Sequence, residues 1–271
     1  MLLDKILLFP YYITLSCRHA LYNSGIWKST HYSIPTICVG NVTVGGTGKT
    51  PMVELLIRMF QGEYRLAVIS RGYKRKSKGL LEVFPDQDYT QTGDEPLQIK
   101  RKFPDVRVFV DSNRGRAISE LERLPENERP ELILLDDAFQ HRKVKADCSI
   151  LLVESSRPIY SDYLLPLGNL RDLPSRSKHA DIIVVTKIRG DLDYSLRRRW
   201  RNDLKLPESF PLHFSKISYL KPLPIFPQDC DMRYAYAKNG VLFSGIANDQ
   251  QIKMELGWRY TINESMKFSD H

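Results

Sequence analysis

The sequence predicts an α/β protein with a mostly parallel sheet, helices on both faces of that sheet, and a smaller C-terminal α/β lobe. From Pro35 onward, short β-branched runs alternate with stretches of helical periodicity, which is the pattern of repeated βαβ units. A glycine-rich segment ending in Gly48-Lys49-Thr50 lies between the first such run and the first helical stretch. Both observations favour a P-loop NTPase-like core.

The composition excludes several classes of protein. Of 271 residues, 42% are hydrophobic and 27% are charged, which excludes a disordered chain, a collagen-like repeat and a polytopic membrane protein. The net charge of +8 and a pI near 9.2 favour an anionic partner, either nucleic acid, an acidic membrane surface or a phosphorylated substrate. The four cysteines form no CxxC pair, which favours a reducing compartment over a zinc knuckle or a disulfide framework.

Residues 1–34 are expected to form an N-terminal helical segment. Twelve uncharged residues lie between Lys5 and Arg18, fewer than the roughly 20 needed to span a bilayer. The surrounding aromatic residues are of the types found at membrane interfaces: Phe9, Tyr11, Tyr12, Tyr22 and Trp27. Two interpretations stay open, a monotopic helix in the headgroup plane and a helix packed on the domain core. The segment does not resemble a cleavable signal peptide.

The core is expected over residues 35–204. Short β-branched runs predict strands at residues 36–40, 65–70, 106–111, 132–135, 149–153 and 182–186. Helical periodicity predicts helices at residues 50–60, 95–102, 114–124 and 192–204.

A second, smaller lobe is expected over residues 205–271. Five prolines fall within residues 205–231, around a short strand-like run at 213–219, and this composition suits a hinge. Beyond it the pattern predicts a strand at 240–245, a helix at 248–256 and an extended segment at 260–268.

The strongest functional signal is VGNVTVGGTGKTP at residues 39–51, which follows a strand and opens a helix. Glycines let backbone N–H groups turn toward phosphate oxygens, and the helix N-terminus adds a favourable dipole. Lys49 is expected to bridge the β- and γ-phosphates, and the Thr50 hydroxyl to bind Mg²⁺. The pattern GxxxxGK[ST] is not met in full, because Thr43 occupies its first glycine. The predicted nucleotide-binding residues are Gly45, Gly46, Thr47, Gly48, Lys49 and Thr50.

A hydrophobic strand ending in two carboxylates, LILLDD at residues 132–137, is the second signal. This Walker B arrangement places an acid beside the Mg²⁺ bound at the phosphate loop. Strands often end in Asp for turn reasons, so the interpretation depends on both motifs lying in one sheet. Asp136 and Asp137 are both candidate metal ligands, together with Thr50.

The sequence also bears on the nucleotide. Guanine-specific P-loop proteins carry [NT]KxD after a late strand, and here Arg189 stands at the position of that Asp, in Thr186-Lys187-Ile188-Arg189. ATP is therefore favoured over GTP. Partitioning and metal-pump ATPases have KGGxGK[ST], and Val44 replaces their signature lysine, which argues against a dimerising ATPase switch without excluding one.

Residue types favour a structural role for QTGDEP at residues 91–96, with Thr92 or Asp94 as a helix N-cap. The basic stretches at 74–78 and 197–201 are more often solvated surface than sites. The stretch at 74–78 follows Arg71 and a sheet strand, so it is the better candidate for binding an anion.

Five motifs occur in an order that is similar to a known family: GNVTVGGTGKTP (40–51), SRGY (70–73), GDEP (93–96), DDAFQH (136–141) and FSDH (268–271). Together they resemble the tetraacyldisaccharide 4′-kinases, which phosphorylate a lipid A precursor. The resemblance extends from the apolar N-terminus to the last residue.

This resemblance implies a peripheral, monotopic kinase on the cytoplasmic face of the bacterial inner membrane, with no nucleic acid partner. It implies transfer of the ATP γ-phosphate, with Mg²⁺, to the 4′-hydroxyl of an acylated glucosamine disaccharide 1-phosphate. The alternative function is a membrane-attached P-loop ATPase switch, whose product is a conformational signal and whose hydrolysis needs no lipid.

The resemblance also assigns residues. It implies a catalytic dyad of Asp94 and His271, a catalytic Arg114 with Arg116 as its competitor, and an acid at Asp172 within Leu170-Arg171-Asp172. Family members continue past the motif that ends here at His271, so the resemblance implies either that the small lobe is truncated or that the natural chain is short.

Overall fold

The protein is described by a computed structural model over residues 2–219, 238–245 and 249–268. Two compact units divide the chain, Met1–Lys216 and Ile217–His271. The predicted limits at 34/35 and 204/205 do not coincide with this division, since residues 205–216 pack with the first unit.

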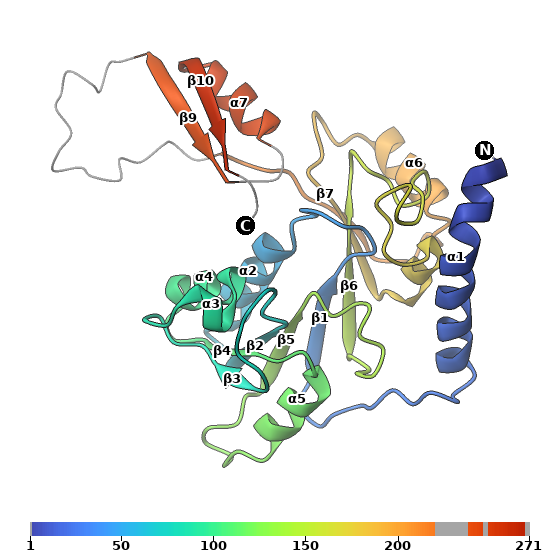
Figure 1. Cartoon of the computed structure of the whole chain (residues 1–271), viewed down its shortest axis with the longest axis vertical. Coiled ribbons are helices and arrows are strands. Elements are labelled where there is room, and N and C mark those ends of the chain that lie inside the picture. The colour runs from blue at the N-terminus through green and yellow to red at the C-terminus, as the bar shows by residue number, and fades with distance from the viewer. Residues whose placement is uncertain (1, 220–237, 246–248, 269–271) are drawn as a thin grey trace, which may run out of the picture. The chain divides into compact units, whose positions relative to one another are not determined.

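The first unit is built on an eight-stranded sheet with the order β3-β4-β2-β5-β1-β6-β7-β8 (Figure 1). Every pair of neighbouring strands is parallel except β3–β4. The six predicted core strands are confirmed to within one residue at each end. The strands are β1 (Thr36–Gly40), β2 (Leu66–Ser70), β3 (Leu81–Glu82), β4 (Arg107–Val110), β5 (Leu132–Asp136), β6 (Cys148–Glu154), β7 (Ile182–Thr186) and β8 (Leu212–Phe214).

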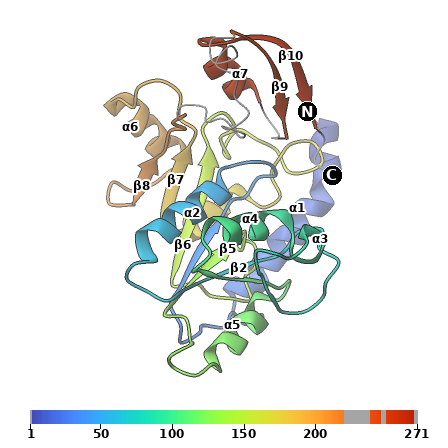
Figure 2. The same ribbon diagram turned by 90° about the vertical axis from the view of Figure 1, so that its left-hand side faces the viewer.

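Helices cover both faces of this sheet, as predicted. Figure 2 shows α2 and α4 in front of the sheet and α1, drawn paler, behind it. The four predicted core helices are present with small shifts at their ends. The helices are α1 (Leu2–Asn23), α2 (Lys49–Phe60), α3 (Tyr89–Thr92), α4 (Asp94–Lys102), α5 (Arg114–Glu122), the 3-10 helix η1 (Pro174–His179) and α6 (Tyr194–Asp203).

Two hydrophobic clusters, one on each face, hold the layers together. Neighbouring residues of one strand contribute to opposite clusters, as Cys38 and Val39 do in β1. The first cluster includes Ile118 of α5, and the second includes Ile57 of α2 and Ile99 of α4. Strands apolar on both faces are what a parallel sheet sandwiched between helices requires.

The start of α4 corrects one expectation. Its N-cap is Gly93 (φ 89°), and no side chain caps the helix. The Thr92 hydroxyl donates instead to the carbonyls of Asp88 and Gly93, and Asp94 lies in the first turn. A Cβ at Gly93 would lie 3.0 Å from the Gly72 Cα, so this tight junction favours glycine and leaves no capping side chain.

The second unit contains β9 (Asn239–Ser244), α7 (Gln250–Gly257) and β10 (Thr261–Lys267). The two strands pair in parallel, with an irregularity between Ile262 and Glu264. The rings of Phe243 and Phe268 stack with centroids 6.3 Å apart. This small parallel pair with its helix matches the predicted order of strand, helix and extended segment.

The end of β1 depends on a close backbone approach. A Cβ at Gly40 would lie 2.4 Å from the Phe139 Cβ and 3.0 Å from the Phe139 backbone nitrogen. Phe139 itself is buried in the segment that follows β5. Glycine at position 40 therefore allows the loops after β1 and β5 to lie against each other.

Gly40→Ala is expected to destabilise the protein by about 1–3 kcal/mol, because the added methyl group overpacks the contact with Phe139. Urea denaturation monitored by circular dichroism measures this change. Gly62→Ala is the matched control, since a Cβ at Gly62 meets no atom within 4 Å. Equal stability of the two variants would contradict the close approach.

Candidate active site

The candidate site lies where the carboxyl ends of β1, β5 and β6 meet. β1 stands between β5 and β6, and the chain order reverses across it. In open α/β sheets, ligands bind at such a switch point. The predicted phosphate loop, residues 41–48, leaves β1 here and leads into α2 (Figure 1).

The phosphate loop has the backbone that its glycines allow. Gly45 (φ 93°) and Gly48 (φ 91°) are left-handed, and Gly48 is the N-cap of α2. Inside the loop, the fully buried Asn41 donates from its side-chain amide to the Thr47 hydroxyl at 2.8 Å. The start of α2, at Lys49, therefore faces the mouth of the loop with its backbone donors, which is the arrangement that binds phosphate.

The two predicted acids have different surroundings. Asp137 has its Oδ1 3.8 Å from the Lys49 Nζ and forms an ion pair with Arg171. Burial raises the pKa of Asp137, but the hydrogen bond from Arg171 and the charges of Lys49 and Arg171 outweigh it and hold the pKa below its ordinary value. Asp137 is therefore ionised and already neutralised by protein cations.

Asp136 is buried, and its Oδ2 accepts a 3.0 Å hydrogen bond from the Ser70 hydroxyl. Its Oδ1 has no hydrogen-bond partner among the described residues. Burial and then the charge of Asp137 raise the pKa of Asp136. This oxygen is therefore available to a cation that reaches the site.

Arg171 ties the two loops together, and sequence reasoning missed its role. Its guanidinium donates to the Asp137 carboxylate and to the side chain of Asn41, with a further bond of 3.3 Å to the Asn41 carbonyl. In the motif Leu170-Arg171-Asp172, the resemblance assigned a role to Asp172 instead. Asp172 is 0% exposed and lies 2.6 Å from the His19 Nε2 of α1, so the acid faces the N-terminal helix.

A second cationic pair, Arg157 and Lys187, lies on the other side of the loop and was also missed. Both pair with the buried Glu154 at the end of β6. Burial raises the pKa of Glu154, but the hydrogen bond from Arg157 and the charge of Lys187 outweigh it and lower the pKa. Lys187 donates to the Gly46 carbonyl, and Arg157 donates to the Val44 carbonyl at 3.4 Å. The motif Thr186-Lys187 contains one of these cations and could have predicted a contact with the phosphate loop, but only Arg189 of that motif was interpreted.

Thr50, the predicted Mg²⁺ ligand, lies in the first turn of α2 and faces the start of α4. Its hydroxyl donates to the Glu95 carboxylate at 3.5 Å. Partial desolvation and then the charge of Asp136 raise the pKa of Glu95. Asp94, the neighbour of Glu95, is exposed. His271, its predicted partner, lies outside the described residues.

The two candidate arginines of α5 separate clearly. Arg114 is buried and donates to the Asp136 carbonyl at 3.3 Å and to the Asp111 carbonyl at 3.2 Å. Arg116 instead donates to both carboxylate oxygens of Asp111, at 2.8 and 2.7 Å. Arg114 therefore contacts the last residue of β5, whereas Arg116 pairs with the acid that follows β4.

Among the residues that the structure describes, no three His, Cys, Asp or Glu side chains gather as a metal site. Of the three predicted metal ligands, Asp136 and Asp137 follow one another at the end of β5, and the Thr50 hydroxyl contacts Glu95.

Comparison with known proteins decides the family. The sequence matches the profile of tetraacyldisaccharide-1-P 4′-kinase (LpxK) over residues 3–271. The chain belongs to the tetraacyldisaccharide 4′-kinase family. Its activity is therefore ATP-dependent phosphorylation of the 4′-position of a lipid A precursor, and the alternative of an ATPase switch is set aside.

Individual relatives agree with this assignment. The tetraacyldisaccharide 4′-kinase of Porphyromonas gingivalis is 42% identical over 262 residues, covering 96% of this chain and 73% of that protein. The one from Flavobacterium johnsoniae is 42% identical and covers 100% of this chain and 79% of its own length. A crystal structure of LpxK from Aquifex aeolicus in complex with ATP superposes with a TM-score of 0.75 at 30% identity, covering 100% of this chain and 83% of that one.

The phosphate loop lysine is expected to be essential for turnover. Lys49→Ala should lower kcat by about 10²-fold or more, because a cation aimed at developing phosphoryl charge is lost. A steady-state kinase assay measures this, with circular dichroism to show that the variant is folded. Lys143→Ala, at an exposed lysine, is the control and should retain full turnover. Near-normal activity of folded Lys49→Ala protein would refute the role of the loop.

Proposed function

We propose that this chain holds ATP with Mg²⁺ at residues 45–50 and phosphorylates a tetraacyldisaccharide 1-phosphate at the cytoplasmic surface of the inner membrane, as a peripheral, monotopic enzyme. The observation that carries the proposal is the arrangement of Lys49, Asp136 and Asp137 at the carboxyl ends of β1 and β5. Phosphoryl transfer requires positive charge around the transferred group; Lys49 supplies one such charge, and the two acids are candidates to hold a second as a metal ion.

The residues present fit a magnesium ion. The unpartnered, buried Oδ1 of Asp136 and the hydroxyl of Thr50 are hard oxygen donors of the kind that Mg²⁺ prefers. Asp137 already pairs with Lys49 and Arg171, so Asp136 is the better placed acid for the metal. When bound, held by Asp136 and Thr50, the ion would supply positive charge that offsets the negative charge of the phosphates during transfer.

In this proposal, basic side chains of the protein contact the transferred phosphate and stabilise the phosphate loop. Lys49 reaches the transferred phosphate from the start of α2. Lys187 and Arg157 bind loop carbonyls, those of Gly46 and Val44, and so keep the loop in the conformation whose N–H groups face the nucleotide. Asp94 orients the 4′-hydroxyl and accepts its proton, with His271 tuning the basicity of that carboxylate.

The test of this function uses labelled ATP and the acyl-disaccharide 1-phosphate in mixed micelles. Label is expected to appear at the 4′-position in the presence of Mg²⁺, and chelation should abolish it. Hydrolysis of ATP that proceeds equally without the lipid, with no label in the disaccharide, would contradict the proposal.

The dyad makes a sharper prediction, which separates catalysis from helix capping. Asp94→Ala and His271→Ala should each lower kcat by about 10²–10⁴-fold, and the double variant should lose little more, because both residues serve one proton transfer. Kinetics of the four proteins measure this cycle. Asp88→Ala is the matched control, since Asp88 is an N-cap that accepts from the Thr90 N–H at 2.7 Å.

Loss of the Asp88 cap should lower the melting temperature slightly and spare turnover. If Asp94→Ala behaves like Asp88→Ala, or if the losses of Asp94 and His271 simply add, the dyad is wrong.

The N-terminal helix α1 supports the membrane part of the proposal. None of the helices in the described part of the chain is long and apolar enough to cross a bilayer. One side of α1 packs on the core through Leu15, which is 6% exposed, while Phe9, Tyr12 and Ile13 are 60%, 52% and 41% exposed. An apolar row on an anchored helix is the kind of surface that inserts into the headgroup region.

The two sides of α1 therefore predict different defects. Replacing Phe9, Tyr12 and Ile13 together with Ser should weaken binding to anionic vesicles by about tenfold or more, because apolar area is no longer transferred from water. The melting temperature should stay unchanged. Leu15→Ser is the control, and it should lower the melting temperature instead. Unchanged vesicle binding in the triple variant, measured by sedimentation, would contradict membrane insertion of α1.

A further inference from the structure

The inward side of α1 carries polar side chains that reach the loops of the active site. Tyr11, Arg18 and His19 share this side with the buried Leu15, at the spacing of one helix face. A helix that served only to attach the chain to a membrane would need an apolar inward side for packing on the core. The polar groups of α1 instead bond to segments more than a hundred residues away in the sequence.

The first contact holds the backbone of Arg171. The Tyr11 hydroxyl donates to the Arg171 carbonyl at 2.9 Å, and the Arg171 backbone N–H donates to the Val42 carbonyl at 2.9 Å. Arg171 is therefore fixed between α1 on one side and the phosphate loop on the other. Partial burial and then the charge of Asp172 raise the pKa of Tyr11, so the hydroxyl keeps the proton that it donates.

The second contact joins His19 to the next residue, Asp172. The His19 Nε2 lies 2.6 Å from the Asp172 Oδ1, and the Arg142 Nη1 lies 3.1 Å from the His19 Nδ1. A guanidinium can only donate, so the Nδ1 accepts and the Nε2 carries the proton that is donated to Asp172. Burial outweighs the hydrogen bond to Asp172 and lowers the pKa of His19, which favours this neutral ring.

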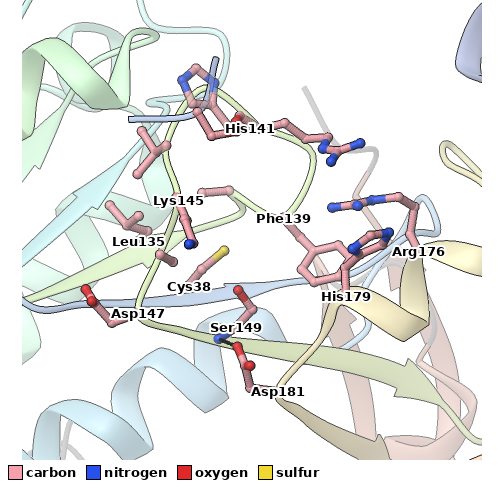
Figure 3. A pocket seen from close by; sticks show the side chains of 15 residues that line it. Cys38, Leu135, Phe139, His141, Lys145, Asp147, Ser149, Arg176, His179 and Asp181 are labelled. Atoms are coloured by element: carbon pink, nitrogen blue, oxygen red, sulfur yellow. Dashed lines mark hydrogen bonds between the residues drawn. The ribbon is translucent and has the colours of Figure 1, made fainter. Parts of the chain in front are cut away.

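The other oxygen of Asp172 faces the 3-10 helix η1. Its Oδ2 lies 3.9 Å from the Arg176 Nε. Arg176 in turn lies beside Phe139 (Figure 3), with its guanidinium 5.2 Å from the centre of the ring. Phe139 belongs to the segment after β5 and packs against Gly40 at the end of β1. Asp172 therefore connects α1 with the segment that follows β5.

The third contact reaches that same segment directly. The Arg18 Nη2 donates to the Gln140 carbonyl at 2.6 Å. The Gln140 side chain donates to the Asn41 carbonyl, which also accepts from Arg171 at 3.3 Å. Two residues held by α1 therefore meet at the first residue of the phosphate loop.

We propose that α1 positions the active site, because its inward polar side chains hold Arg171 and Gln140 against Asn41. Phosphoryl transfer depends on the exact placement of the groups around the phosphate, so loss of these contacts lowers the rate of transfer. The role belongs to the inward side of α1 and does not depend on membrane contact by its exposed side. The positioning residues are Tyr11, Arg18 and His19.

The experiment measures steady-state kinetics of the whole chain with ATP and the acyl-disaccharide 1-phosphate in mixed micelles, together with melting temperatures. Tyr11→Phe removes one hydrogen bond and should lower kcat by about three- to tenfold. The KM for the lipid should stay unchanged, whereas weaker membrane contact would raise that KM. Tyr194→Phe is the matched control and should keep full kcat, because Tyr194 is 77% exposed on α6.

A double-variant cycle shows whether Tyr11 acts through Arg171. Adding Tyr11→Phe to Arg171→Met should cost little beyond the loss in Arg171→Met alone, since the guanidinium that Tyr11 positions is then absent. Losses in kcat that add would overturn the proposal. A contact that matters only for stability would lower the melting temperature and leave kcat intact, which would also overturn it.

His19 supplies an independent test. His19→Leu should lower kcat by about tenfold or more, because the buried Asp172 loses its donor. His19→Gln should recover most of this loss, since an amide offers a donor for Asp172 and an acceptor for Arg142. His31→Gln is the matched control, because His31 makes a similar 2.7 Å contact with Asp147, which precedes β6 at the opposite end of the sheet.

The proposal is overturned if folded Tyr11→Phe or His19→Leu protein keeps normal kcat, or if His19→Gln is no more active than His19→Leu. Should His19→Leu protein fail to fold, the Tyr11 cycle decides, because Tyr11→Phe removes a single oxygen atom. None of these outcomes bears on membrane contact by α1, which vesicle binding tests at the exposed side of the helix.

Discussion

The bridge from Arg171 to Asp137 and Asn41 is the interaction on which the active site depends. Asn41 begins the phosphate loop after β1, and Asp137 follows β5, so one guanidinium fixes the distance between the two loops. It also leaves Asp137 ionised beside Lys49. The charge of Asp137 is thereby matched within the protein, whereas burial and then the charge of Asp137 raise the pKa of Asp136. The Oδ1 of Asp136 has no hydrogen-bond partner among the described residues.

Most of the fold could be predicted from the sequence because a parallel sheet between helices has a strong local signature. Strands such as β1 and β5 are short apolar runs, and the helices between them carry clear periodicity. The elements that were missed have no such pattern. β3 has two residues, α3 has four, and η1 is a single 3-10 segment. The cap of α4 was misassigned because the contact between Gly93 and Gly72 joins segments that are far apart in the sequence.

The residues of the candidate site also fall into those that the sequence predicts and those that it does not. The phosphate loop and the Walker B acids lie within continuous motifs, so their residues were predicted by number. Arg171, Lys187 and Glu154 act through contacts between separate strands and loops, and residue type alone does not reveal those contacts. Arg171 is an example. The resemblance assigned a role to the neighbouring Asp172, but Asp172 contacts His19 of α1.

The measurement that tests this account most directly is the pH dependence of kcat/KM for Arg171→Met protein, compared with the unaltered chain. Removing the guanidinium takes positive charge away from the Asp136–Asp137 pair, so the pKa values of the pair should rise. Activity is lost as pH falls through those values, and the acidic limb of the profile should therefore move to higher pH. Arg199→Met, on exposed α6, should leave the profile in place. An acidic limb that stays where it was in Arg171→Met would contradict the claim that Arg171 keeps Asp137 ionised.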